Sequence, residues 1–138
     1  MIPSHFDLAD EEFERHFATA KLDPSLFSHE AHLRLAYIQI SKYGEEQAIA
    51  NITAQIWRYV QKLGAEDKFN KTLTIAAIKA VHHFLKRSTT PDFLSLTTEF
   101  PRLKYNFKEL MAAHYSQDIY NSPLAKQQFL EPDRLAFT

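Results

Sequence analysis

Residues 68–85, KFNKTLTIAAIKAVHHFL, are the stretch that decides the fold of this chain. Plotted at about 100° per residue, the hydrophobic side chains of this stretch cover more than half of a helix surface. Its lysines and His82 are confined to the remaining strip. A pattern of this kind is typical of a helix surrounded by other helices. We therefore expect a central helix here, in a protein built from helices.

Signals for helix ends lie on both sides of this stretch. Gly44 and Gly64 follow hydrophobic helical runs, where a residue of left-handed conformation commonly ends a helix. Ser28 and the pair Ser122-Pro123 are typical helix starts. The β-branched residues occur at helical rather than alternating spacing, so no strand is predicted. The predicted helices span residues 8–19, 29–43, 45–63, 68–87, 91–99 and 103–114, with a short seventh at 123–130.

These helices predict an all-α fold. We expect a single compact bundle of about six helices joined by short loops, with residues 1–138 forming one helical domain. A chain of 138 residues suits one hydrophobic core. Its content of 45% hydrophobic and 24% charged residues is that of an ordinary globular protein.

The composition excludes several classes of function. With 16 basic and 17 acidic residues, the chain lacks the basic excess that a nucleic-acid partner would favour. The absence of cysteine excludes disulfides, thiolate nucleophiles and cysteine metal sites, and two glycines are too few for phosphate-binding glycine loops. No run approaches the roughly 18 apolar residues of a membrane helix, and the N-terminus lacks the pattern of a secretory signal. We predict a cytoplasmic protein without a membrane partner.

The motif that most suggests chemistry is FSHEAHL, at residues 27–33. It resembles the zinc-protease signature H-E-x-x-H with one residue missing. On a helix, Glu30 would lie about 160° from His32, too far round to act on water bound to a metal there. His29 falls at the centre of the hydrophobic stripe and His32 on its edge, whereas Arg34 falls on the polar face with Glu30. We predict that both histidines face the interior, while Glu30 points to solvent or to another helix.

Two polar residues of the central helix extend this candidate site. Asn70 and Thr74 lie one turn apart on a face that is predicted to be buried. Asn70 can also cap the helix and Thr74 can bond to its own backbone, so a structural role stays open for each. Helix N-termini present free N–H groups to anions. If the starts of the helices at 29–43 and 68–87 meet, they form a pocket for a small polar or anionic molecule.

In this hypothesis His29 and His32 are the catalytic residues, acting as acid or base if the pocket carries chemistry. Asn70, Thr74 and Tyr115 bind the ligand. A first alternative is a metal-dependent enzyme, in which His29 and His32 hold a divalent transition metal with a third ligand from elsewhere. A second alternative is a non-enzymatic interaction protein with structural histidines. A homodimer is compatible with each of these hypotheses.

Three segments resemble one protein family: FSHEAHLRLAYIQISKYG at residues 27–44, KFNKTLTIAAIKAVHHF at 68–84 and HYSQDIYNSPLAKQQFLEPD at 114–133. They are similar to a group of small bacterial all-helical proteins with an F-[ST]-H-x-x-H-L motif, a C-terminal Y-S…F-x-x-P-D segment and no established activity. In that group a histidine often stands where this chain has Asn70. This departure from the family pattern argues against a three-histidine metal site here, because an amide is a poor ligand for transition metals.

Overall fold

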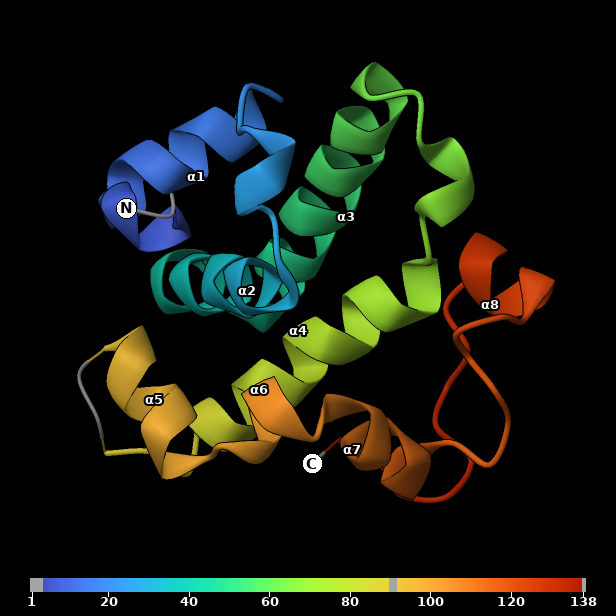
Figure 1. The fold of residues 1–138 in the computed structure, drawn as a ribbon. Helices are drawn as coiled ribbons and strands as arrows, with labels where there is room; N and C mark the ends of the chain where they lie inside the picture. The colour runs from blue at the N-terminus through green and yellow to red at the C-terminus, as the bar shows by residue number, and fades with distance from the viewer. Residues whose placement is uncertain (1–3, 90–91, 138) are drawn as a thin grey trace. The chain divides into compact units, whose positions relative to one another are not determined.

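The computed structural model describes residues 4–89 and 92–137, and in these ranges it contains eight α-helices and no strand (Figure 1). The predicted all-α class is thus confirmed, with a helix count slightly above the predicted six. The helices are α1 Asp10–Ala18, α2 His29–Tyr43, α3 Glu45–Lys62, α4 Lys71–Leu85, α5 Phe93–Glu99, α6 Arg102–Tyr105, α7 Phe107–His114 and α8 Pro123–Gln127, with 3₁₀ turns η1 His5–Asp7, η2 Pro24–Leu26 and η3 Glu66–Lys68.

Local capping explains where these helices begin and end. The Ser28 side chain accepts a hydrogen bond from the Ala31 N–H at the start of α2, as expected for an N-cap. Gly44 separates α2 from α3 and has φ +87°, a conformation that side-chain-bearing residues rarely adopt. The predicted helix at 103–114 is two helices, because Asn106 leaves helical geometry between α6 and α7. The predicted start of another helix at residue 91 lies outside the described residues.

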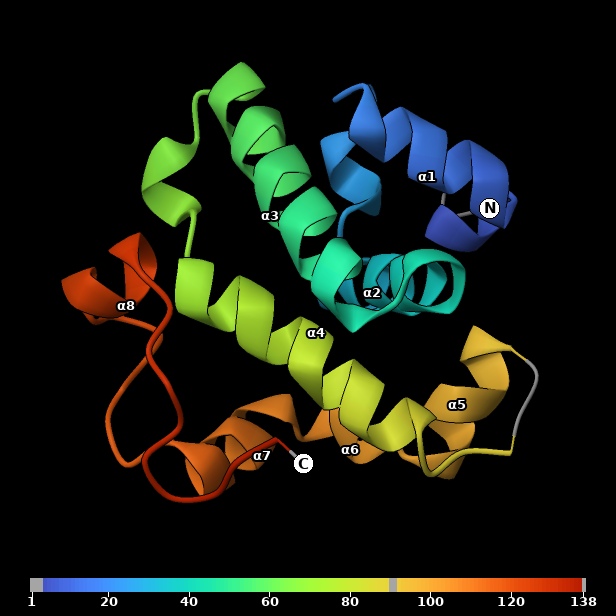
Figure 2. The same ribbon diagram turned by 180° about the vertical axis from the view of Figure 1, so that it is seen from behind.

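The chain divides into two compact units, Met1–Phe69 and Asn70–Thr138, which we call the N-terminal and C-terminal units. In the N-terminal unit, α2 packs against α3, and α1 contacts both helices (Figures 1 and 2). A buried amide joins the first pair, since Asn51 Nδ2 donates to Gln39 Oε1 at 3.0 Å. The prediction that residues 1–138 form one domain stays a prediction.

Arg34, which the sequence places on the polar face of α2 with Glu30, is buried in the N-terminal unit. Its guanidinium donates to the carbonyl oxygens of His5 and Leu8 and to Asp10 Oδ1, the last two at 2.8 Å. It also lies over the Phe13 ring, 4.6 Å from the centroid. The segment before α1 folds over the polar stripe of α2 through these contacts. As a result Arg34 is buried together with the hydrophobic residues of α2, which the hydrophobic stripe alone did not indicate.

In the C-terminal unit, α8 packs against α4, and α6 contacts both α5 and α7 (Figure 1). Two polar side chains at the start of α4, those of Asn70 and Thr72, form hydrogen bonds to later parts of the C-terminal unit. Thr72, which is fully buried, donates to the Gln128 carbonyl at 2.8 Å and accepts from the Leu130 N–H at 3.1 Å. Asn70 caps α4 by accepting from the Leu73 N–H at 3.0 Å. The capping role considered for Asn70 is therefore observed.

Asn70 has a second role that makes its loss costly. Its Nδ2 donates to the Ile119 carbonyl at 2.8 Å, so one side chain satisfies a helix start and a distant loop. Asn70→Ala should lower the free energy of unfolding by about 2 kcal/mol, because it removes a cap and leaves a buried carbonyl unpaired. Urea unfolding checks this value. Asn106→Ala is the control, since Asn106 makes no side-chain cap bond, and a similar loss in both variants would contradict the assignment.

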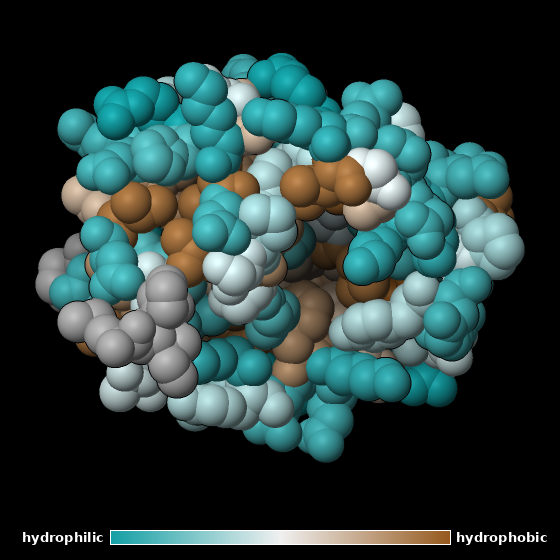
Figure 3. Space-filling model, turned by 45° about the horizontal axis from the view of Figure 1, so that its top comes forward, coloured by the Kyte–Doolittle hydropathy of each residue, from teal (hydrophilic) through white to brown (hydrophobic). Residues whose placement is uncertain are grey.

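The surface of the described residues is mixed in polarity. On the face seen in Figure 3, hydrophobic side chains reach the surface in separate places between hydrophilic ones. None of the helices in the described ranges combines the length and hydropathy that a membrane span requires. The most exposed large hydrophobic residues are Tyr105, Leu94, Leu135 and Leu124.

Candidate functional site

His29 is exposed, so the prediction that it faces the interior is wrong. Its side chain is exposed, whereas burial along α2 begins at Ala31. The reason is its place at the first position of the helix. Side chains in a helix tilt toward its N-terminus, so the first residue extends beyond the packed part of the helix. A hydrophobic stripe drawn on a wheel does not show where along the axis burial starts.

His32 matches the prediction more closely. The residue is half-buried, but its Nε2 atom is shielded from solvent and has no hydrogen-bond partner. Burial lowers the pKa of His32 from 6.5 to about 4, with a further lowering by the nearby His29. At neutral pH the ring is therefore uncharged. The catalytic role of His29 and His32 stays a prediction.

Glu30 was predicted to point either to solvent or to another helix. Its side chain contacts His5 of the 3₁₀ turn η1. Its Oε1 lies 3.0 Å from Nε2 of His5, which is a buried residue. This pair does not extend to a metal site. In the described parts of the chain, no three histidine, cysteine, aspartate or glutamate side chains are grouped to hold a metal ion. The third ligand that the metal hypothesis needs is thus not found among residues 4–89 and 92–137.

The other predicted site residues belong to the C-terminal unit. Asn70 and Thr74 are both buried, and the side chain of Asn70 is committed to the α4 cap and to Ile119. Tyr115 is buried as well, and its hydroxyl donates to the Leu130 carbonyl at 2.7 Å. The role of these three residues in ligand binding stays a prediction. Tyr115 lines a cavity.

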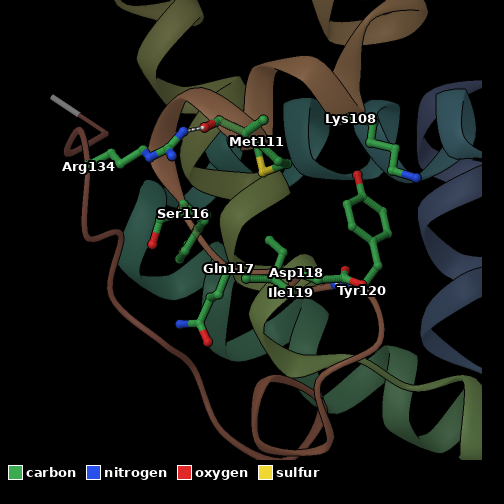
Figure 4. A pocket seen from close by; sticks show the side chains of 10 residues that line it. Lys108, Met111, Ser116, Gln117, Asp118, Ile119, Tyr120 and Arg134 are labelled. Atoms are coloured by element: carbon green, nitrogen blue, oxygen red, sulfur yellow. Dashed lines mark hydrogen bonds between the residues drawn. The ribbon is translucent and has the colours of Figure 1, made fainter.

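That cavity is a pocket of about 270 Å³ that lies wholly within the C-terminal unit (Figure 4). It is built from one side of α7, the loop that follows α7 and one residue of the C-terminal segment. We call it the α7 pocket. Its lining residues are Lys108, Met111, Ala112, Tyr115, Ser116, Gln117, Asp118, Ile119, Tyr120 and Arg134.

The α7 pocket has a hydrophobic floor and a polar rim. Met111, Tyr115 and Ile119 are each at most 3% exposed and form the floor. Lys108 and Arg134 are exposed charged residues of the rim, and Figure 4 shows that they come from opposite sides of the pocket. Such a combination of apolar walls and a few polar groups is typical of small-molecule sites.

The loop after α7 is held in shape by two carboxylates. Asp118 accepts from the Tyr120 N–H at 2.9 Å and from Asn121 Nδ2 at 2.8 Å. Asp133 accepts from the Ser116 N–H at 2.9 Å and from the Ser116 hydroxyl. These hydrogen bonds are the main reason why the pKa values of both carboxyls are lowered. Both groups are therefore ionised at neutral pH and tie down the pocket's loop.

The C-terminal segment closes one side of the pocket. The Arg134 N–H donates to the His114 carbonyl at 3.0 Å, and Arg134 Nη1 donates to the Ala112 carbonyl at 3.2 Å. His114 is buried, and its Nδ1 donates to the Leu135 carbonyl at 2.6 Å. Its ring stacks on that of Phe137, with 4.0 Å between the ring centroids. Because the last carbonyl groups of α7 receive these bonds, the segment holds Arg134 at the rim.

No protein-family model matches the chain, and the searches of the curated proteins and of the solved structures return no match either. The resemblance to the uncharacterised helical family therefore stays a prediction.

Sequence reasoning identified only Tyr115 among the pocket's residues. Lys108 and Arg134 carry no motif of their own, and they lie 26 positions apart in the chain. A signal was present in the family-like segment Y-S…F-x-x-P-D, because its Ser116 and Asp133 are the pair that joins the loop to the C-terminal segment. The motif thus marks the frame of the pocket rather than its lining.

Proposed function

We propose that this protein binds a small molecule with a hydrophobic body in the α7 pocket. The observation that carries the proposal is the buried floor of Met111, Tyr115 and Ile119 beneath a rim with charged and polar groups. Removing the apolar surface of a ligand from water supplies the free energy of binding. The polar rim then selects the orientation of the ligand.

The size of the pocket limits the ligand. A cavity of about 150 Å³ is large enough for benzene, and pockets for drug-sized molecules begin at roughly 300 Å³. At about 270 Å³, the α7 pocket suits a single substituted ring or a branched aliphatic chain. The sequence predicted a small polar or anionic ligand at the starts of α2 and α4. The proposal keeps a small ligand but gives it a hydrophobic body and places it at α7.

The function is tested by filling the pocket from its rim. Ala112 lines the pocket, whereas its neighbour Ala113 is equally exposed on α7 and does not line it. Ala112→Phe should weaken binding of phenylacetamide and phenylacetate at least tenfold, because the new ring occupies the space that the ligand needs. Ala113→Phe should bind as the parent protein does. Two-dimensional amide NMR titrations measure both variants.

In the parent protein, the largest shift changes should occur at amides of residues 108–120 and 134. Two results contradict the proposal. One is the absence of saturable shifts for both probes in the parent protein. The other is an equal effect of Ala112→Phe and Ala113→Phe, which would indicate that the ligand binds elsewhere or that any added ring disturbs α7.

A further inference from the structure

The two basic residues at the rim of the α7 pocket, Lys108 and Arg134, form no salt bridge with an acid among the described residues. The Lys108 ammonium lies 5.5 Å from the centroid of the Tyr120 ring, and Arg134 donates one side-chain bond, to the Ala112 carbonyl. Since a guanidinium has five N–H donors, Arg134 retains donors for a ligand.

The two carboxylates near the pocket, Asp118 and Asp133, accept hydrogen bonds from the loop after α7. Asp118 accepts three hydrogen bonds, from Tyr120 and Asn121, and Asp133 accepts two from Ser116. Lys108 also lowers the pKa of Asp118 slightly, so part of its positive charge is offset there. Arg134 has the same weak effect on the pKa of Asp133. Both carboxylates keep their negative charge, but their hydrogen bonds are made to the loop. The groups at the rim that can donate to a ligand are the Lys108 ammonium and the remaining N–H groups of Arg134.

The tyrosines of the pocket do not oppose an anion. Burial raises the pKa values of both Tyr115 and Tyr120, and nearby acids raise them further. Both phenols are therefore protonated and neutral at physiological pH. They add aromatic surface next to the floor without adding negative charge.

We propose that the ligand of the α7 pocket is a small aromatic or branched aliphatic carboxylate, whose carboxylate pairs with Arg134 while its hydrophobic body contacts Met111 and Ile119. This inference rests on the proposed function and assigns its ligand class. The planar guanidinium matches a carboxylate through two parallel hydrogen bonds. Its attachment to the end of α7 through Ala112 holds the group at the rim before the ligand arrives. Lys108, on the opposite side, contributes attraction without a fixed geometry (Figure 4).

The test compares two probes of nearly the same shape. Phenylacetate should bind at least tenfold more tightly than phenylacetamide, which lacks the charge. Arg134→Gln should remove this preference, because it weakens the binding of phenylacetate far more than that of phenylacetamide. Arg134→Lys, which keeps the charge but not the planar fork, should retain only part of it. Arg102→Gln is the matched control, because Arg102 is an exposed arginine outside the pocket and should leave both affinities unchanged.

The outcomes separate this inference from the function on which it rests. Equal affinity for both probes in the parent protein would overturn the carboxylate class and leave small-molecule binding intact. A preference for phenylacetate that survives Arg134→Gln would overturn the role of Arg134. If neither probe binds, the proposed function and the ligand class fail together. Titrations followed at the amides of residues 108–120 distinguish all of these results.

Discussion

Arg34→Met should lower the free energy of unfolding by about 3–4 kcal/mol. The methionine can fill much of the space beside Phe13 but offers no donor. The carbonyl oxygens of His5 and Leu8 then lose their partner in a site that water reaches poorly. The exposed side chain of Asp10 can be solvated instead, so little of the loss is assigned to that ion pair.

A matched control exists in the same unit. Arg58 also donates from Nη1 to a backbone carbonyl, that of Ala18 at 2.8 Å, but it is exposed. Arg58→Met should cost about 1 kcal/mol or less, because water replaces its bond. Arg34→Lys should lose most of what Arg34→Met loses, since an ammonium cannot reach three acceptors in a plane. Urea unfolding gives the free energies.

Hydrogen exchange provides a second readout for Arg34. Its contacts hold the segment before α1, so Arg34→Met should raise the amide exchange rates of residues 5–8 more than those of α3. Equal losses for Arg34→Met and Arg58→Met, with unchanged exchange in the segment, would show that the buried arginine is not what attaches it.

Acid should destabilise the protein through His32. Its pKa is 6.5 as the ordinary value and about 4 in the folded protein. Between these values the unfolded chain binds more protons than the folded one, so the free energy of unfolding falls as the pH falls. The loss begins near pH 6.5 and reaches up to about 3 kcal/mol near pH 4. Above pH 6.5 His32 is neutral in both states and contributes no pH dependence.

His32→Leu tests this assignment, because leucine cannot take up a proton. The variant should lose most of the pH dependence between about pH 6.5 and 4, whereas His29→Gln should keep it, since burial is the larger cause of the shift. Acids with lowered pKa values, such as Asp118 and Asp133, start from 3.8 and act in a lower window. Urea unfolding at several pH values measures the curves, and parallel curves for His32→Leu and the parent protein would contradict the prediction.

The sequence was most informative about helix ends, because each end depends on a few neighbouring residues. Ser28 caps α2 through an N–H three positions away, and Ser122 caps α8 in the same way. Gly44 and Gly64 both adopt positive φ after a helix, where their lack of a side chain permits it. Interactions of such short range depend only on residues a few positions apart. The all-α class and most helix bounds can therefore be predicted from the sequence alone.

Three features could be seen only in the tertiary structure, because each depends on residues far apart in the chain. The burial of Arg34 requires Asp10 and the segment before it, 24 positions away, and the second role of Asn70 requires Ile119, 49 positions away. The α7 pocket likewise needs Arg134 to return to the end of α7. Periodicity indicates which side of a helix is apolar, but not which segment covers its polar side. For that reason the sequence predicted the helices, while their packing determined that His29 is exposed, that Arg34 is buried and where the pocket lies.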